Sequence, residues 1–190
     1  MDASPDRWAV GLESQLHFEI AQLVARNARG VDRCDWDLMR STYHPDAVDD
    51  HGSICGSPQE LADYLASRVA TVGVMFHFLG QTLLLEIDRE RHRAVAETAC
   101  VGYQTLRPDA PVSALFDAGD GSSGVSAMGV RYVDEFEDRD GDLRISRRTV
   151  VYEWASASVS TADPFLTGKR QGVRGPGDFS YAVLGGRDQA

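Results

Sequence analysis

A histidine and an aspartate that lie far apart in the sequence are the residues best suited to acid–base chemistry. His77 stands in the run 75–80 with large apolar residues on both sides, so we expect it to be buried. A buried imidazole needs a hydrogen-bond partner. If Asp32 is that partner, its carboxylate fixes the tautomer, and the other ring nitrogen can take a proton from a substrate. The alternative is a core histidine whose ring is bonded only to the backbone.

The position of Asp32 depends on where two helices meet. Gly30 is expected to end the first helix, and Asp35 is a good N-cap for a helix that starts at Trp36. Asp32 then lies in the joint, where a carboxylate can point inward without disturbing a helix interior. The alternative is a turn-capping aspartate that faces water.

Helical periodicity and capping signals predict three helices in the first half of the chain. Ser57 and Pro58 supply the N-cap and the first helical residue of the third helix. A turn signal at 44–46 precedes the one short strand expected in this half. The predicted helices cover residues 8–27, 36–43 and 58–72, and the strand covers 47–51.

The second half of the chain predicts a sheet. Runs rich in Val, Thr, Tyr and Phe alternate with short polar turns, which is typical of an antiparallel meander. We therefore expect an α+β fold, in which the three helices cross a strongly curved antiparallel sheet and enclose a cone-shaped cavity. The predicted long strands cover residues 74–88, 94–106, 125–136 and 143–154.

Two other segments have a composition of their own. The connection 107–124 is rich in Pro, Asp, Gly and Ser and is longer than a hairpin needs, so it is a candidate lid or interface loop. The expected domain covers 1–156. Glycines interrupt the tail 157–190, but its large apolar residues lead us to expect that part of it packs over the domain or over a neighbouring subunit.

Charge and cysteine content restrict the function classes. The net charge of −10, from 29 acidic and 19 basic residues, disfavours nucleic acid and anionic membranes as partners. The 3 cysteines show no C-x-x-C spacing, and no compact cluster of histidines and carboxylates suggests a metal site. No export signal or membrane span is recognisable. We expect a cytoplasmic protein that uses neither a metal nor another cofactor.

Arginines and tyrosines on the predicted strands are candidate substrate contacts. An unpaired guanidinium in the interior would be very costly. We expect Arg131 or Arg148 to point into the cavity and to bind a substrate oxygen while pairing with an acid. The alternative is an arginine on the outer face, paired with Glu135 or Glu153.

Tyr103 and Tyr152 could donate hydrogen bonds to an enolate or to a leaving oxygen. The alternative for these two tyrosines is that they fill the core and keep their hydroxyl groups at its rim. Both remain candidate substrate contacts.

Four segments, taken together and in this order, resemble the SnoaL-like branch of the nuclear transport factor 2 superfamily. The similarity extends from Leu16 to Trp154 and is greatest towards scytalone dehydratase, hexachlorocyclohexane dehydrochlorinase and bile acid 7α-dehydratase. The resemblance implies a catalytic pair in which Asp32 orients the ring and His77 acts as the base. The segments are 30–37, 49–53, 76–80 and 102–107.

The sequence departs from this family at two positions. Gln104 stands where scytalone dehydratase has a second catalytic histidine, so that imidazole is absent. His51 stands near a tyrosine that polarises the substrate in that enzyme, and it could act as the acid or be only a turn residue. Arg148 roughly matches an arginine implicated in bile acid dehydratase. We therefore do not assume that this protein catalyses the same dehydration as scytalone dehydratase.

The sequence leads us to expect a cofactor-independent lyase that acts on a hydrophobic, ring-containing small molecule. Water is the first candidate for the leaving group, and halide or formaldehyde are others. Three alternatives remain. They are an isomerase, a polyketide cyclase in which an acidic residue instead of His77 transfers the proton, and a non-catalytic binding or accessory subunit. The outer face of the sheet needs cover, which together with the resemblance suggests a homotrimer first and a dimer second.

Overall fold

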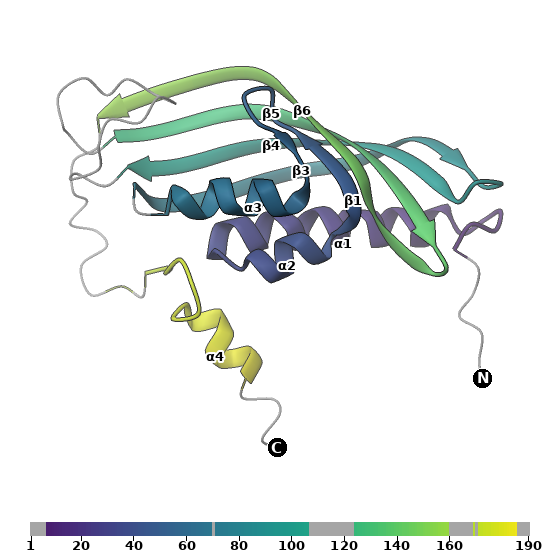
Figure 1. Cartoon of the computed structure of the whole chain (residues 1–190), viewed down its shortest axis with the longest axis horizontal. Helices are drawn as coiled ribbons and strands as arrows, with labels where there is room; N and C mark the ends of the chain where they lie inside the picture. The colour runs from purple at the N-terminus through teal and green to yellow at the C-terminus, as the bar shows by residue number, and fades with distance from the viewer. Residues whose placement is uncertain (1–6, 70, 107–123, 160–168, 170, 186–190) are drawn as a thin grey trace.

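The computed structural model describes residues 7–69, 71–106, 124–159, 169 and 171–185. It has the α+β cone fold that the sequence predicts: a six-stranded curved sheet arches over the helices of the first half of the chain (Figure 1). In chain order the elements are α1 (Glu13–Arg33), α2 (Trp36–Ser41), β1 (Tyr43–Asp50), β2 (Cys55–Gly56), α3 (Pro58–Ser67), β3 (Val72–Asp88), β4 (Arg93–Leu106), β5 (Gly124–Arg139), β6 (Asp142–Val159) and α4 (Phe179–Gly185).

The strands follow the order β2-β1-β6-β5-β4-β3 in the sheet. The four long strands form the predicted meander, in which each strand is antiparallel to the next. β1 returns from the helical half and pairs in parallel with β6. This crossover closes the helices against the concave face of the sheet. The predicted loop 107–124 lies, apart from Gly124, outside the described residues.

The joint between α1 and α2 differs from the sequence prediction. Gly30 does not end α1, which continues to Arg33 and is capped by Cys34 in the left-handed conformation, at φ 55°. A side chain at Gly30 would place its Cβ only 2.7 Å from the backbone nitrogen of Met39. Gly30 is therefore required for the close approach of the two helices. Asp35 caps α2 as predicted, because its carboxylate accepts a hydrogen bond from the Leu38 amide at 3.0 Å.

The start of α3 was predicted correctly, whereas its end was not. Ser57 and Glu60 form a capping box, and Pro58 is in the first turn. The helix ends at Ser67, and the first long strand already begins at Val72. β1 is longer than predicted because it starts directly after α2, at Tyr43.

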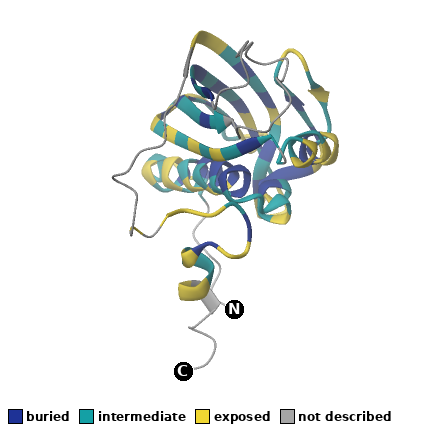
Figure 2. Ribbon diagram, turned by 90° about the vertical axis from the view of Figure 1, so that its left-hand side faces the viewer, coloured by how far each residue is buried: buried dark blue, intermediate teal, exposed yellow. Residues whose placement is uncertain are grey.

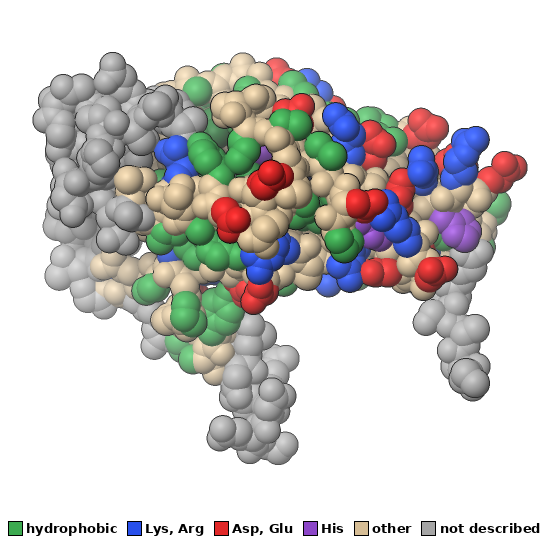
Figure 3. Space-filling model, in the orientation of Figure 1, with side chains coloured by type: hydrophobic (Ala, Val, Ile, Leu, Met, Phe, Trp, Pro, Cys, Tyr) green, Lys and Arg blue, Asp and Glu red, His purple; other side chains and the backbone are tan. Residues whose placement is uncertain are grey.

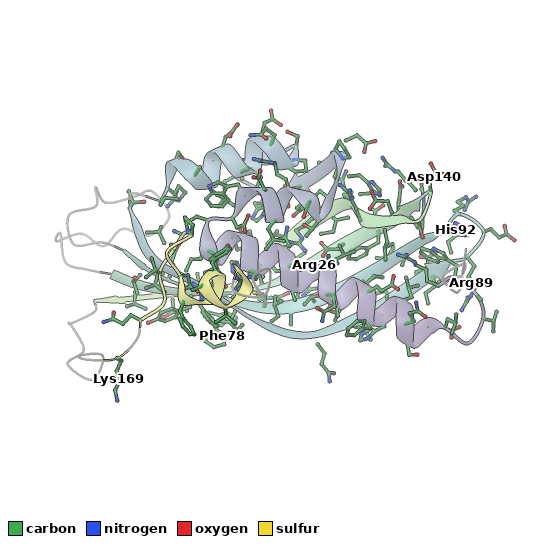
Figure 4. The ribbon with its side chains drawn as sticks, turned by 90° about the horizontal axis from the view of Figure 1, so that it is seen from below. Arg26, Phe78, Arg89, His92, Asp140 and Lys169 are labelled. Atoms are coloured by element: carbon green, nitrogen blue, oxygen red, sulfur yellow. The ribbon has the colours of Figure 1, made fainter. Side chains whose placement is uncertain are left out.

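The core lies between the sheet and the helices, where buried segments of both face one another (Figure 2). Five of its largest fully buried side chains come from α1, β1, β5 and β6. The hairpin turns with Arg89, His92 and Asp140 lie at one end of the molecule, and Lys169 lies at the other end (Figure 4). Charged side chains also concentrate at the end with the hairpin turns (Figure 3). The five core residues are Leu16, Ile20, Tyr43, Phe136 and Ile145.

The outer face of β3 remains exposed. Phe76 and Phe78 lie side by side with ring centroids 4.7 Å apart, and 58% of Phe78 is accessible to solvent. Leu83 and Leu85 extend this apolar strip after an irregularity in the strand. Such a strip on one chain is typical of a surface that another protein covers. No helix in the described ranges combines the length and the apolar character needed to cross a membrane.

Candidate active site

A cavity of about 130 Å³ opens between the concave face of the sheet and helices α1 and α3. Its wall is mostly apolar, with Val31, Leu61, Met75 and Val130 among its residues. A cavity of roughly 150 Å³ can hold a benzene molecule. The available space therefore suits a small ring. Polar side chains reach the cavity at a few points only, and these points determine what it can do chemically.

Asp32 and His77 meet at the cavity wall. Oδ1 of Asp32 lies 2.6 Å from Nδ1 of His77, and Oδ2 accepts a hydrogen bond from the backbone amide of His77 at 3.2 Å. Because an ionised carboxylate can only accept, Nδ1 is the nitrogen that carries the proton. In the neutral ring Nε2 is then an acceptor, and it has no hydrogen-bond partner among the described residues.

The two side chains come from elements that hold them rigidly. His77 lies in the middle of β3, opposite Gly102 of β4, and only 11% of its side chain is exposed. The sequence suggested that Asp32 lies in a joint between two helices. In the structure it lies in the last turn of α1. A carboxylate in the last turn of a helix is disfavoured by the helix dipole. Its position there is explained by the contact with His77.

A second aspartate–histidine pair lies at the end of β1, and its His51 lines the cavity. Nε2 of His51 lies 2.7 Å from Oδ1 of Asp49, and the Tyr43 hydroxyl donates to the other oxygen. Burial raises the pKa of Asp49, but His51, the Arg148 charge and the Tyr43 hydroxyl outweigh it and hold the pKa below its usual value. Asp49 therefore stays ionised.

Sequence reasoning missed Asp49. The signal was present, because the strand predicted over 47–51 contains both Asp49 and His51, and residues two apart on a strand share a face. In the structure β1 ends at Asp50, and His51 follows it directly.

Arg148 lines the cavity, but its charge is already neutralised. Nε and Nη2 each donate to Asp134 at 2.7 Å, and Nη1 donates to Asn27 at 2.8 Å. The guanidinium also lies over the Tyr132 ring, 4.2 Å from its centroid. Burial by itself would lower the pKa of Arg148, whereas the charge of Asp134 raises it well above its usual value. Arg148 is a permanent cation with a permanent partner.

Arg131 does not lie in the cavity. Its guanidinium pairs with Glu97 at 2.7 Å and with Glu153 at 2.6 Å. Of the two arginines that the sequence offered, it is therefore not the one that points into the cavity, and its placement matches the outer-face alternative with Glu153 as a partner. Arg131 pairs with Ala99 and Val151 in the sheet. Its neighbours Val130 and Tyr132 line the cavity, so the Arg131 side chain lies on the opposite, outer face. A charged residue on a long strand gives no sequence signal for which face it occupies.

The two predicted tyrosines differ. Tyr152 lies on the same face of β6 as Arg148, borders the cavity and keeps its proton, because burial raises the pKa of its hydroxyl. Tyr103 also borders the cavity, but it alternates with Gly102 and Gln104 along β4. Its side chain therefore belongs to the other face of the sheet. Gln104 is buried and lines the cavity directly.

The tail contributes a residue that the sequence did not reveal. Arg174 lines the cavity and donates to the backbone carbonyl groups of Val31 and Val72, at 3.2 and 3.4 Å. The Tyr181 hydroxyl donates to Asp35 at 2.8 Å. The described part of the tail thus contacts the joint between α1 and α2. No periodic pattern surrounds Arg174, so nothing in the sequence indicated this contact.

Metal binding has no support from the side chains that the structure places. Among these residues, no group of three histidine, cysteine or acidic side chains could hold an ion. The polar side chains that line the cavity instead carry two imidazoles, two amides and several hydroxyl and guanidinium groups. This set suits proton transfer and hydrogen bonding.

A family model for the SnoaL-like domain matches residues 13–149. No curated protein matches the chain. Among solved structures, a hexachlorocyclohexane dehydrochlorinase from Novosphingobium barchaimii is similar, with a TM-score of 0.61 and 17% identity, over 80% of this chain and 97% of that one. A Novosphingobium aromaticivorans protein assigned as a scytalone dehydratase has a TM-score of 0.59 and 12% identity, over 84% of this chain and 97% of that one.

A third similar structure comes from the same organism. It is the beta subunit of a protein assigned as an aromatic-ring-hydroxylating dioxygenase, with a TM-score of 0.54 and 16% identity, over 80% of this chain and 95% of that one. At these identities the likeness to all three structures establishes the fold and no more.

Proposed function

The chain belongs to the SnoaL-like family, and from this premise we propose that it is a cofactor-independent lyase with His77 as its general base. The observation that carries the proposal is the 2.6 Å contact between Asp32 and Nδ1 of His77. It directs Nε2 towards an apolar cavity large enough for a small ring. The substrate is a hydrophobic, ring-containing small molecule.

The reaction begins at a carbon-bound hydrogen. Nε2 of His77 takes the proton, and Asp32 compensates the positive charge that forms on the ring. The electron pair of the broken C–H bond forms a double bond, and the group on the neighbouring carbon leaves with its own pair. When that group is hydroxide, His51 donates the proton that turns it into water, and Asp49 balances the charge of His51. Water is our first candidate for the leaving group.

Two simple ring ketones test the base even while the natural substrate is unidentified. Loss of water from β-hydroxycyclohexanone and loss of chloride from β-chlorocyclohexanone both give cyclohexenone, after the same proton abstraction. Absorbance of the enone measures both eliminations, and deuterium uptake from heavy water measures proton abstraction alone. A positioned base contributes about 10²–10⁴-fold to the rate. His77→Gln is therefore expected to lose a factor of that size on both compounds.

The matched control is His92→Gln, an exposed histidine in the turn between β3 and β4. It should leave both rates unchanged. Elimination that survives His77→Gln at the normal rate contradicts the proposal. If the wild-type protein shows neither elimination nor deuterium uptake, the proposed lyase function is also contradicted, and a ligand-binding or accessory role is favoured.

Several copies of the chain are expected to assemble. The apolar strip on the outer face of β3 is the surface that we propose they cover, in a trimer first and a dimer second. Light scattering of the purified protein measures the assembly. Phe78→Glu should shift it towards the monomer, whereas a monomeric normal protein contradicts this part of the proposal.

A further inference from the structure

Two buried polar groups on the concave face of the sheet have no partner. Gln104 is only 2% exposed, and its Nε2 makes no hydrogen bond to any described residue. Ser126, also 2% exposed, stands opposite Gln104 on β5, and its hydroxyl is equally unpaired in the described part of the chain. A buried donor without an acceptor is destabilising, because the cost of removing it from water is not compensated. Groups of this kind require an explanation, and a role in binding is one.

Gln104 lines the cavity at a position next to the proposed base. Gly102 and Gln104 of β4 pair with His77 and Met75 of β3. Gln104 is therefore the next residue of β4 after Gly102 on the face of the sheet that His77 shares, and it is a diagonal neighbour of His77. Diagonal neighbours on one face of a sheet lie roughly 7–8 Å apart. This spacing of the two residue positions is short enough for one small ring to reach both side chains. A guest whose hydrogen meets Nε2 of His77 can therefore present its far side to Gln104.

Gly102, which lines the cavity opposite His77, adds no side chain to it. A Cβ added there would meet the Met128 side chain at 3.4 Å, an ordinary contact distance. The amide of Gln104 can also turn at low cost, because the terminal torsion of glutamine is broad. The donor is thus able to follow an acceptor that enters the cavity.

We propose that the Gln104 amide binds an oxygen of the substrate, and that the substrate is a ring ketone rather than a halogenated hydrocarbon. This inference rests on the proposed function of His77 and narrows its substrate class. When His77 removes a hydrogen next to the carbonyl group, the electron pair moves onto the carbonyl oxygen and forms an enolate. Gln104 donates to that oxygen, where the negative charge develops. The enolate then expels the leaving group from the neighbouring carbon and becomes an enone.

A hydrocarbon or halocarbon substrate has no acceptor for this amide. Its binding would leave Nε2 buried and unpaired, so we expect such a compound to bind less tightly than a ketone of the same shape. Most of the remaining wall is apolar, and its polar side chains Asn27, His51 and Arg148 already have partners within the protein, so they give no comparable reason to distinguish the two classes. Gln104 is therefore the residue that selects for oxygen.

Binding of two isosteric probes tests the inference. Cyclohexanone and methylenecyclohexane have nearly the same shape, and only the ketone accepts a hydrogen bond. A neutral hydrogen bond is worth about 0.5–1.5 kcal/mol, so the normal protein should bind the ketone roughly two- to tenfold more tightly. Gln104→Met keeps the size of the side chain and should abolish this preference. The control, Gln81→Met at an exposed position of β3, should retain it.

A second readout follows the amide itself. The side-chain amide resonances of Gln104, assigned by their loss in Gln104→Met, should shift when the ketone binds and should not shift with the alkene. Equal affinities for the two probes in the normal protein overturn the inference, and so does a ketone preference that survives Gln104→Met. His77→Gln should keep the preference, because binding the oxygen does not need the base. An inactive protein that still prefers the ketone contradicts only the proposed lyase function.

Discussion

His77, paired with Asp32, and Arg148, paired with Asp134, both line one cavity, yet they differ in how many of their polar atoms are already paired. Every guanidinium nitrogen of Arg148 donates to Asp134 or Asn27, and Arg148 is 3% exposed. His77 uses one ring nitrogen for Asp32 and directs the other towards the cavity. The saturated pair is a structural element, and the unsaturated pair is the one that can react.

This difference gives a general criterion for polar groups at a cavity wall. A group whose hydrogen bonds are all satisfied by the protein has nothing left to offer a ligand without losing a partner. A group that keeps one unpaired atom towards the cavity is available. By this criterion His77 and Gln104 are the candidates for a functional role, whereas Arg148 is held by Asp134 and Asn27.

The largest expected effect comes from breaking the saturated pair. Arg148→Met leaves Asp134 as an uncompensated buried charge, which costs roughly 3–5 kcal/mol of the free energy of unfolding. Urea denaturation measures this loss. The double variant with Asp134→Leu removes both charges and should recover much of the stability. A cost of Arg148→Met below about 1 kcal/mol would show that the pair is not the support that we describe.

An intermediate effect concerns the second aspartate–histidine pair. The pKa of Asp49 is lower in the folded protein than its usual value, so the unfolded state takes up a proton more readily as the pH falls. The stabilising contribution of this carboxylate is complete above the usual pKa and is lost as the pH falls through the folded pKa. Thermal unfolding between neutral and strongly acidic pH should show this loss. Asp49→Asn should show a smaller loss, and an unchanged acid profile would contradict the assignment.

The smallest effect is expected on the outer face. Arg131 pairs with Glu97 and Glu153 at the surface, where screening by solvent leaves such pairs little net contribution. Arg131→Gln should change neither the unfolding midpoint nor elimination from β-hydroxycyclohexanone. A clear loss of activity in this variant would make Arg131 a substrate contact after all and weaken the contrast between the two faces.

The sequence predicted the elements well because their signals are local. The N-cap at Asp35, the capping box at Ser57 and the long strands after Val72 all depend on residues within a few positions. Gly30 misled the prediction because its role is a contact with Met39 in the next helix. Likewise, the partners of Arg131 and Arg148 depend on strand register, which the sequence does not specify.

The candidate site could be predicted only in part. Asp32 and His77 are 45 positions apart and were linked by the family resemblance, and the structure brings them into contact. Asp49 could have been inferred from its spacing to His51. Arg174 could not, because the path of a Gly-rich tail is set by tertiary contacts alone.

The protonation state of the His77 ring tests the central claim most directly. Nitrogen NMR of the histidine rings distinguishes a proton on Nδ1 from one on Nε2 and needs no substrate. We predict that neutral His77 carries its proton on Nδ1, that this proton resonates far downfield because Asp32 accepts it, and that Asp32→Ala removes the downfield signal. A neutral ring protonated on Nε2 would contradict the account, since the nitrogen that faces the cavity could not then act as a base.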